Sequence, residues 1–312
     1  VISGGVDGSF SLSRSRIDFQ DINGDGFADI LISPSKDELY VYYSSLGRTG
    51  LLKTVTNPLG GTITMDYHKT TASTQHPRRW VLNTVALNDS LSGDGADEIL
   101  RTFEYEAGYY DKQERNFYGF AIVKEKFHDN NTIKKRITRY YYNNSYYTKG
   151  LLLTEELRNG NDSLYIVTMN KYNSHVLTRN NVSSMYVTMD TSIICYYEGT
   201  GSAQIRQEKV FRYDNTTGNL VYQKDSSTTQ AAVELYIRYH KDPGNHCISL
   251  VSEVEIPGYR KRTTEIDNKG HITDIKDYYT TSSALVSQMQ YDKYGNIICM
   301  RSPNTTTYFE YD

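Results

Sequence analysis

Short apolar runs rich in β-branched and aromatic residues alternate with clusters of turn-forming residues along the chain. Residues 29–32 and 39–43 are two such runs, and the Ser, Pro, Lys and Asp residues of 33–37 separate them. Residues 50–67 show the same pattern, with Asn-Pro and Gly-Gly pairs between two runs. These are signals of β-hairpins, and no segment keeps a helical period over roughly twelve residues. The pattern predicts a mainly β fold built of antiparallel hairpins.

One motif recurs with a regular period in the last third of the chain. It has an aromatic or apolar residue, then usually Asp, then a turn that contains Gly and leads to Leu or Ile. Its second positions, 214, 240, 267 and 292, lie 26, 27 and 25 residues apart. The copies begin at Tyr213, Tyr239, Ile266 and Tyr291, and another begins at Tyr311. One such unit is a hairpin that cannot bury a face alone, so neighbouring units are expected to stack side by side.

The repeat has limits that the sequence itself shows. His240 and Ile266 stand where the motif has Asp and Tyr, and no copy before residue 205 is regular enough to align. Because Tyr311 and Asp312 begin a new copy, we expect the chain to be a segment of a longer protein with further units.

Composition supports strands and excludes some partners. The chain has 29 Tyr, one Trp and six Pro in 312 residues, which is typical of sheet. A Tyr on a strand packs its ring against cross-strand neighbours while its hydroxyl reaches water or a lumen. The net charge is −3 without a basic stripe, so we expect no nucleic-acid partner, and no apolar run is long enough to predict a membrane span.

The three cysteines, Cys195, Cys247 and Cys299, are far apart and lack the spacing of a metal site. Their odd number and isolation predict buried thiols.

The stretch DINGDGFAD, residues 21–29, has the spacing of a calcium loop. Asp21, Asn23 and Asp25 occupy positions 1, 3 and 5, and Asp29 occupies position 9. Calcium takes six to eight hard oxygens, and position 7 of comparable loops gives its carbonyl, which here belongs to Phe27. The sequence therefore predicts Ca²⁺ bound by these five residues, to pin the loop rather than to activate water.

Two features of this loop restrict the prediction. Position 12, which is a bidentate Glu in an EF-hand, is Ile32, and the flanks are strand-like, so the loop is not an EF-hand. The alternative is an Asp/Asn/Gly turn that holds no metal. The loop followed by a hairpin resembles a blade of FG-GAP/VCBS β-propellers, in which calcium lies between strands.

No motif for catalysis is present. The histidines, among them His68, His76, His128 and His175, do not fall in HExxH, and there is no GxSxG elbow or phosphate-binding glycine loop. Glu155 and Glu156 are adjacent on a strand-like segment, so their side chains point to opposite faces. We expect no enzymatic activity in this chain, although a site scattered over several loops stays open.

Four motifs in order carry a family resemblance over roughly residues 15–160. They are GLLKTVTNPLGGTITMDY at 50–67, HPRRWVLNTV at 76–85, EYEAGYYDKQERNFYGFAIV at 104–123 and YYTKGLLLTEEL at 146–157. They resemble the middle/N-terminal region of the B component of insecticidal Tc toxins and of SpvB-like proteins, which carry FG-GAP repeats before it. The later hairpin units resemble YD repeats, also called RHS repeats, whose strands spiral into a hollow shell.

The resemblance implies an organisation and a function. It implies an FG-GAP-like propeller end at 1–45, a Tc B-component-like β segment at 46–200 and RHS/YD repeats at 201–312. It implies a secreted or surface-located toxin segment whose shell encloses a C component or C-terminal effector and works with a pore-forming A component. The alternative is a calcium-stabilised extracellular module for adhesion or glycan binding.

Overall fold

The structure is a computed structural model that describes residues 16–23, 27–45, 50–71, 78–91, 98–129, 132–179, 181–241 and 248–311. All regular secondary structure in these ranges is β-strand, and every strand pairing is antiparallel. The prediction of a mainly β, antiparallel fold is confirmed. None of the described residues form a helix with the length and apolarity to cross a bilayer.

The chain divides into two compact units, residues 1–151 with 159–161, and residues 152–158 with 162–312. The first unit holds a three-stranded sheet, β1-β2-β3, and a second sheet that runs in chain order from β4 to β9. Its strands are β1 (Arg16–Gln20), β2 (Asp29–Ser35), β3 (Glu38–Tyr42), β4 (Thr54–Thr56), β5 (Thr62–Lys69), β6 (Trp80–Asn88), β7 (Glu98–Asp111), β8 (Asn116–Asp129) and β9 (Thr132–Tyr141).

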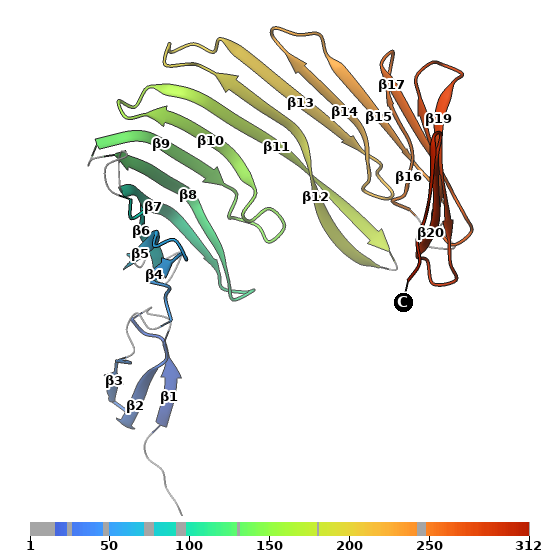
Figure 1. Cartoon of the computed structure of the whole chain (residues 1–312). Helices are drawn as coiled ribbons and strands as arrows, with labels where there is room; N and C mark the ends of the chain where they lie inside the picture. Colours follow the sequence, from blue (N-terminus) through green and yellow to red (C-terminus); the bar gives the residue numbers. More distant parts are fainter. Residues whose placement is uncertain are drawn as a thin grey trace, which may run out of the picture. The chain divides into compact units, whose positions relative to one another are not determined.

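The second unit is a meander in which each strand from β10 to β21 pairs with the next one. Figure 1 shows these strands following one another in chain order. They are β10 (Leu152–Asn159), β11 (Leu164–Arg179), β12 (Val182–Tyr196), β13 (Ile205–Tyr213), β14 (Leu220–Ser227), β15 (Val233–Tyr239), β16 (Val251–Ile256), β17 (Arg260–Ile266), β18 (Ile272–Tyr278), β19 (Ala284–Tyr291), β20 (Ile297–Ser302) and β21 (Thr305–Tyr308).

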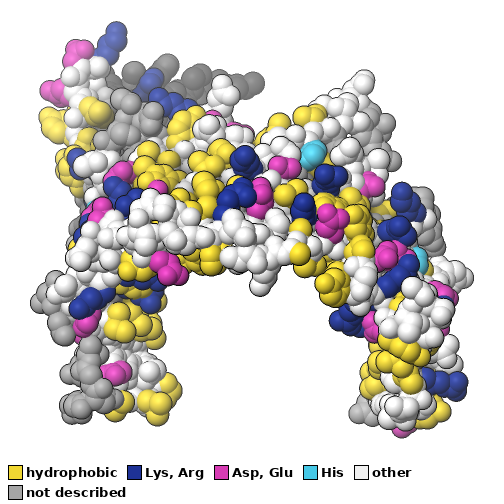
Figure 2. All heavy atoms as spheres, turned by 90° about the horizontal axis from the view of Figure 1, so that it is seen from above, with side chains coloured by type: hydrophobic (Ala, Val, Ile, Leu, Met, Phe, Trp, Pro, Cys, Tyr) yellow, Lys and Arg dark blue, Asp and Glu magenta, His cyan; other side chains and the backbone are white. Residues whose placement is uncertain are grey.

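The described strands contact only their neighbours in sequence, so each sheet is a single layer. Few side chains are fully buried as a result, and most large apolar ones are half-buried between neighbouring strands. Figure 2 shows hydrophobic side chains intermixed with Lys, Arg, Asp and Glu on the face in view. Packing is therefore carried by cross-strand pairs rather than by a second layer.

Two of the three cysteines bear out the prediction of buried thiols. Cys195 on β12 and Cys299 on β20 are buried and form no disulfide, and Cys247 lies outside the described residues. The three-part division at residues 45 and 200 stays a prediction.

Candidate functional site

Asp29, the last residue of the predicted calcium loop, is the first residue of β2 and is fully buried. Its Oδ1 accepts a hydrogen bond from the backbone N–H of Ser44 at 2.8 Å, and its Oδ2 accepts from the N–H of Ile22 at 2.9 Å and of Asn23 at 3.4 Å. The Ser44 bond is the main reason that the pKa of Asp29 lies below its usual value, against the opposing effect of burial. Asp29 thus ties the loop before β2 to the residues after β3.

The other predicted calcium ligands differ in their burial and in their partners. Asn23 Oδ1 accepts from Lys69 Nζ at 3.4 Å, Asp21 is exposed and Phe27 is half-buried. Asp25 lies outside the described residues. The side-chain oxygens of Asn23 and Asp29 therefore already have protein partners, and the partner of Asn23 is an ammonium that would repel a cation. No group of three or more His, Cys, Asp or Glu side chains in the described part of the chain is arranged to hold a metal ion.

The repeated Asp residues build the turns between strands. Asp214 Oδ1 accepts from the backbone N–H groups of Thr216 (2.8 Å) and Thr217 (2.9 Å). Asp267 Oδ1 accepts from those of Lys269 (2.8 Å) and His271 (2.9 Å). These are Asx turns, in which a side chain stands in for a backbone acceptor.

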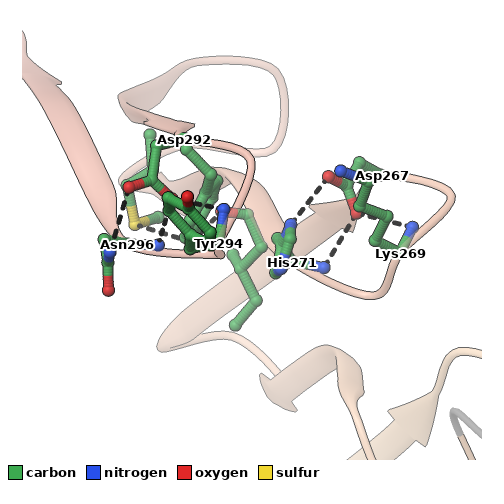
Figure 3. A network of polar contacts seen from close by, with 9 residues as sticks. Asp267, Lys269, His271, Asp292, Tyr294 and Asn296 are labelled. Atoms are coloured by element: carbon green, nitrogen blue, oxygen red, sulfur yellow. Dashed lines mark hydrogen bonds and ion pairs between the residues drawn. The ribbon is translucent and has the colours of Figure 1, made fainter.

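Asp292 forms the third turn of this kind. Its Oδ1 accepts from the backbone N–H groups of Tyr294 (2.8 Å) and Asn296 (2.9 Å), and its Oδ2 accepts from Asn296 Nδ2 at 2.9 Å. Figure 3 shows the Asp267 and Asp292 carboxylates each turned into its own loop. The carboxylates close the turns and do not point outward together toward a ligand.

The hydrogen bonds also set the charge state of these carboxyls. The Thr216 hydroxyl and backbone N–H, with the N–H of Thr217, lower the pKa of Asp214 to about 2. In Asp267, desolvation opposes the shift, but the N–H groups of His271 and Lys269 and the His271 ring bring its pKa below the usual value. The turns therefore favour ionised aspartate.

Three of the repeated tyrosines have a partner that the sequence did not indicate. The hydroxyl of Tyr239 donates to the carbonyl of Leu220 (2.8 Å), that of Tyr291 to Ile272 (2.7 Å) and that of Tyr311 to Ile297 (2.9 Å). Leu220, Ile272 and Ile297 each begin the strand that follows a repeated turn. Each tyrosine thus reaches back to the turn of the preceding unit.

The same contact occurs twice in the part of the chain where no repeat could be aligned. Tyr67 donates to the carbonyl of Leu52 and Tyr172 to that of Leu152, both at 2.9 Å. In all five cases the acceptor carbonyl lies just before the point where two neighbouring strands begin to pair. Its residue stands two positions before the first paired residue: Leu152, for example, stands two positions before Thr154, which pairs with Met169. The hydroxyl therefore donates to a carbonyl at the end of the backbone hydrogen-bond ladder between two strands.

A bulge accompanies most of these tyrosines. The strand register shifts between Asp66 and Tyr67, Lys171 and Tyr172, Arg238 and Tyr239, and Gln290 and Tyr291. A bulge adds a residue to one strand and re-aims the side chain beside it. The sequence signal that could have revealed the early copies is the Gly-Leu-Leu run at 50–52 and 150–152, followed by Tyr 15 and 20 residues after the acceptor leucine.

His240 shows how a departure from the motif is accommodated. Its backbone N–H donates to the carbonyl of Leu250 at 2.8 Å, as Asp267 N–H does to His271 at 2.9 Å, so the backbone closure is kept. Its ring Nε2 lies 2.9 Å from the carbonyl of Thr264 on β17. The histidine thus contacts another strand at the position where the motif has Asp.

Two polar groups that resemble parts of enzyme sites have structural partners instead. His271 Nδ1 lies 2.9 Å from Asp267 Oδ2, but the His271 ring stacks on Tyr291 with centroids 4.6 Å apart. The buried carboxylate of Glu125 bonds Arg139 (3.0 Å) and lies 3.5 Å from Arg101. The first group therefore ties the β17–β18 turn to β19, and the second cross-links β7, β8 and β9.

Residues 6–155 match the family of the insecticide toxin TcdB middle/N-terminal region. No curated protein is similar enough to this chain to count as a match. The match covers the part of the chain in which the sequence showed the Tc B-component motifs, so the chain contains a Tc B-component-like region.

Solved structures of Tc toxin complexes share the fold. The crystal structure of TcdB2-TccC3 without its hypervariable C-terminal region has a TM-score of 0.58 at 13% identity and covers 94% of this chain and 20% of that chain. The crystal structure of TcdB2-TccC3 has a TM-score of 0.56 at 14% identity, with 92% and 20% covered. The Photorhabdus luminescens Tc holotoxin pore has a TM-score of 0.58 at 13% identity, with 92% and 19% covered. This chain spans about one fifth of those chains.

Proposed function

We propose that this chain is a non-catalytic wall segment of a secreted bacterial Tc-type toxin, and that the wall encloses and delivers a toxic effector. The observation that carries the proposal is a single-layer meander whose hairpin units contain Asx turns and are linked to one another by tyrosine bonds, on a fold shared with TcdB2-TccC3. A layer that contacts only its sequence neighbours can be extended strand by strand, which suits a wall.

The partners follow from this proposal. TcdB2-TccC3 and the holotoxin pore are complexes, so we propose a C component or C-terminal effector as cargo and a pore-forming A component as the delivery partner. The hairpin repeats of residues 201–312 are RHS/YD repeats, and the resemblance to SpvB-like proteins applies to the first compact unit. The aspartates and histidines that look reactive serve the turns, in keeping with a segment that does no chemistry.

Protease protection of the effector tests the enclosure. The complete toxin polypeptide that contains this chain is assembled with its C component, and digestion of the effector is followed over time. We expect protection in the wild type and faster digestion when Asp292→Ala and Tyr291→Phe together weaken one turn. Tyr294→Ala, at an exposed side chain of the same turn, is the control. An effector digested at the same rate inside and outside the wild-type assembly would contradict the proposal.

We also propose that loop 21–29, at the FG-GAP-like end, binds calcium through Asp21, Asn23, Asp25, Asp29 and the Phe27 carbonyl. The alternating oxygen ligands support this, whereas the amide bonds of Asp29 support a turn that needs no metal. Calcium would pin the loop between strands.

Two variants separate the two possibilities. If calcium binds, Asp25→Ala lowers the melting temperature with calcium and has no effect in EGTA. Asp29→Ala lowers it in both conditions, because three backbone N–H groups lose their acceptor. An equal loss for Asp25→Ala with and without EGTA excludes calcium.

A further inference from the structure

Two neighbouring hairpin turns of the second unit present exposed tyrosines. Tyr259 lies in the β16–β17 turn, closed by its N–H bond to the Ile256 carbonyl at 3.0 Å, and is 86% exposed. Tyr279 lies in the β18–β19 turn, closed by its N–H bond to the Ser283 carbonyl at 3.1 Å, and is 68% exposed. Rings this exposed contribute little to packing the sheet.

Both rings line one hollow with a volume of about 390 Å³. Arg260, Lys261 and the hydroxyl-bearing Thr280 and Thr281 line it as well. A second hollow of about 270 Å³ shares Ile256 and Arg260 and adds Val254 and Arg262. A volume in this range holds a small ligand, and the lining combines aromatic planes with a few polar groups.

On the face of the sheet that carries Arg260 and Arg262, positively charged side chains outnumber carboxylates. Arg262 binds Asp277 with two bonds of 2.7 Å, whereas Arg260 approaches the same carboxylate only to 3.5 Å and its side chain is 65% exposed. The register pairs Arg260 with Ile256, and Arg262 with Val254 and Asp277, on one face. Two guanidinium groups thus share one carboxylate, and Arg260 retains donors for an anion.

On the opposite face of the sheet, the numbers of positively charged side chains and carboxylates are closer to equal. The register pairs Lys261 with Glu255, which also lines the hollow. Lys261 Nζ binds Glu253 at 2.7 Å, and Arg238 binds the other oxygen of Glu253 at 2.7 Å. A ligand carboxylate is therefore favoured on the Arg260 side of the hollow.

The position of the hollow favours a sugar over a peptide. β16, β17, β18 and β19 each pair on both edges, so an extended peptide cannot add to the sheet by backbone hydrogen bonds. Aromatic planes can stack on the apolar face of a pyranose ring, and hydroxyl, ammonium and guanidinium groups bond its substituents.

We propose that the hollow between the β16–β17 and β18–β19 turns binds a glycan that carries a carboxylate, with Tyr259 and Tyr279 stacking on sugar rings and Arg260 binding the carboxylate. The site is separate from enclosure of an effector, so either proposal can fail without the other. It supplies a contact to acidic sugars at the turn end of these strands.

Binding to defined oligosaccharides tests the site on the full 312-residue chain. The probes are 3′-sialyllactose and a hyaluronan tetrasaccharide, followed by isothermal titration, and lactose is the uncharged comparison. We expect at least one acidic probe to bind at least tenfold more tightly than lactose. Tyr259→Ala and Arg260→Gln should each weaken it at least tenfold, and Tyr294→Ala, 77% exposed but outside the hollow, should not.

The side chains of Tyr259, Tyr279 and Arg260 are largely exposed, so the variants should keep the circular dichroism spectrum and melting temperature of the wild type. No binding of either acidic probe, or equal binding of lactose, overturns the proposal. Displacement of the acidic probe by poly-glutamate with equal strength would assign the hollow to acidic peptides instead.

Discussion

The hydroxyl of Tyr291 shows what a repeated tyrosine does at the level of one residue. Its ring stacks on His271, and its O–H serves the Ile272 carbonyl at the end of a strand ladder. The sequence predicted a hydroxyl that reaches water or a lumen. For this residue the hydroxyl bonds backbone instead, and desolvation together with the charge of Asp267 raises its pKa.

Tyr291→Phe removes this one bond and keeps the ring. We expect the free energy of unfolding to fall by about 1 kcal/mol, because a half-buried carbonyl loses its partner. Urea unfolding of the full chain measures the change. Tyr294→Phe, at an exposed hydroxyl, should be neutral, and an equal effect of the two variants would remove the role assigned to the bond.

Asp214 makes a turn sensitive to acid. Its pKa in the folded chain is about 2, below the ordinary 3.8, so its contribution to stability is full above about pH 4 and is lost as the pH falls through 2. The wild type should therefore lose, between pH 5 and pH 2, a contribution that Asp214→Asn lacks at every pH. Melting temperatures of both proteins over this range measure it, and parallel curves would contradict it.

The motif residues could be read from the sequence, but their contacts could not. Asp267 and Asp292 stand at the predicted turn positions because Asp caps its own turn locally. The acceptors of Tyr239 and Tyr291 lie 19 residues away and depend on strand register. The sequence therefore predicted the turns, which depend on local contacts. It could not predict the strand register, because a one-residue bulge shifts it.

At the level of elements, the glycines of the turns hold left-handed backbone. Gly218, Gly270 and Gly295 occupy the same place in their turns, with φ of 75°, 88° and 91°. An L side chain is strained in this region. Glycine is thus the residue that the turn joining one unit's two strands accommodates without strain.

Gly270→Ala should lower the free energy of unfolding by about 1 kcal/mol, because alanine must adopt a positive φ. Lys269→Ala is the matched control, since its side chain is exposed and its N–H bond to Asp267 is kept. Thermal unfolding of both variants measures the difference. A control as damaging as the glycine variant would mean that the turn tolerates no change, rather than that φ decides.

The sequence predicted individual hairpins well, but it did not show how the hairpins before residue 205 belong to a repeat. Period-2 runs and Asp/Gly turns indicated the strands of 205–311, whereas β11 and β12, 16 and 15 residues long, carried no turn that could phase a repeat. The tyrosine bonds at Tyr67 and Tyr172 show that the same ladder end occurs before residue 205.

At the level of the whole molecule, single-layer sheets make stability local. Because each described strand contacts only its neighbours, a weakened turn is felt by the adjoining strands and fades with distance along the chain. A globular core would instead spread the loss over every strand. The arrangement also explains how one sheet can carry connections that begin with different residues, such as Asp267 and His240.

Asp292→Ala tests this locality. It removes the acceptor of the Tyr294 and Asn296 N–H groups in the turn between β19 and β20. Amide hydrogen exchange should accelerate in β19, β20 and β21 and stay unchanged in β4 to β9, because the second group belongs to the other compact unit. Exchange followed by mass spectrometry resolves the two groups. Uniform acceleration over all strands would show that the chain unfolds as one cooperative body, and the local character of stability in these sheets would then have to be abandoned.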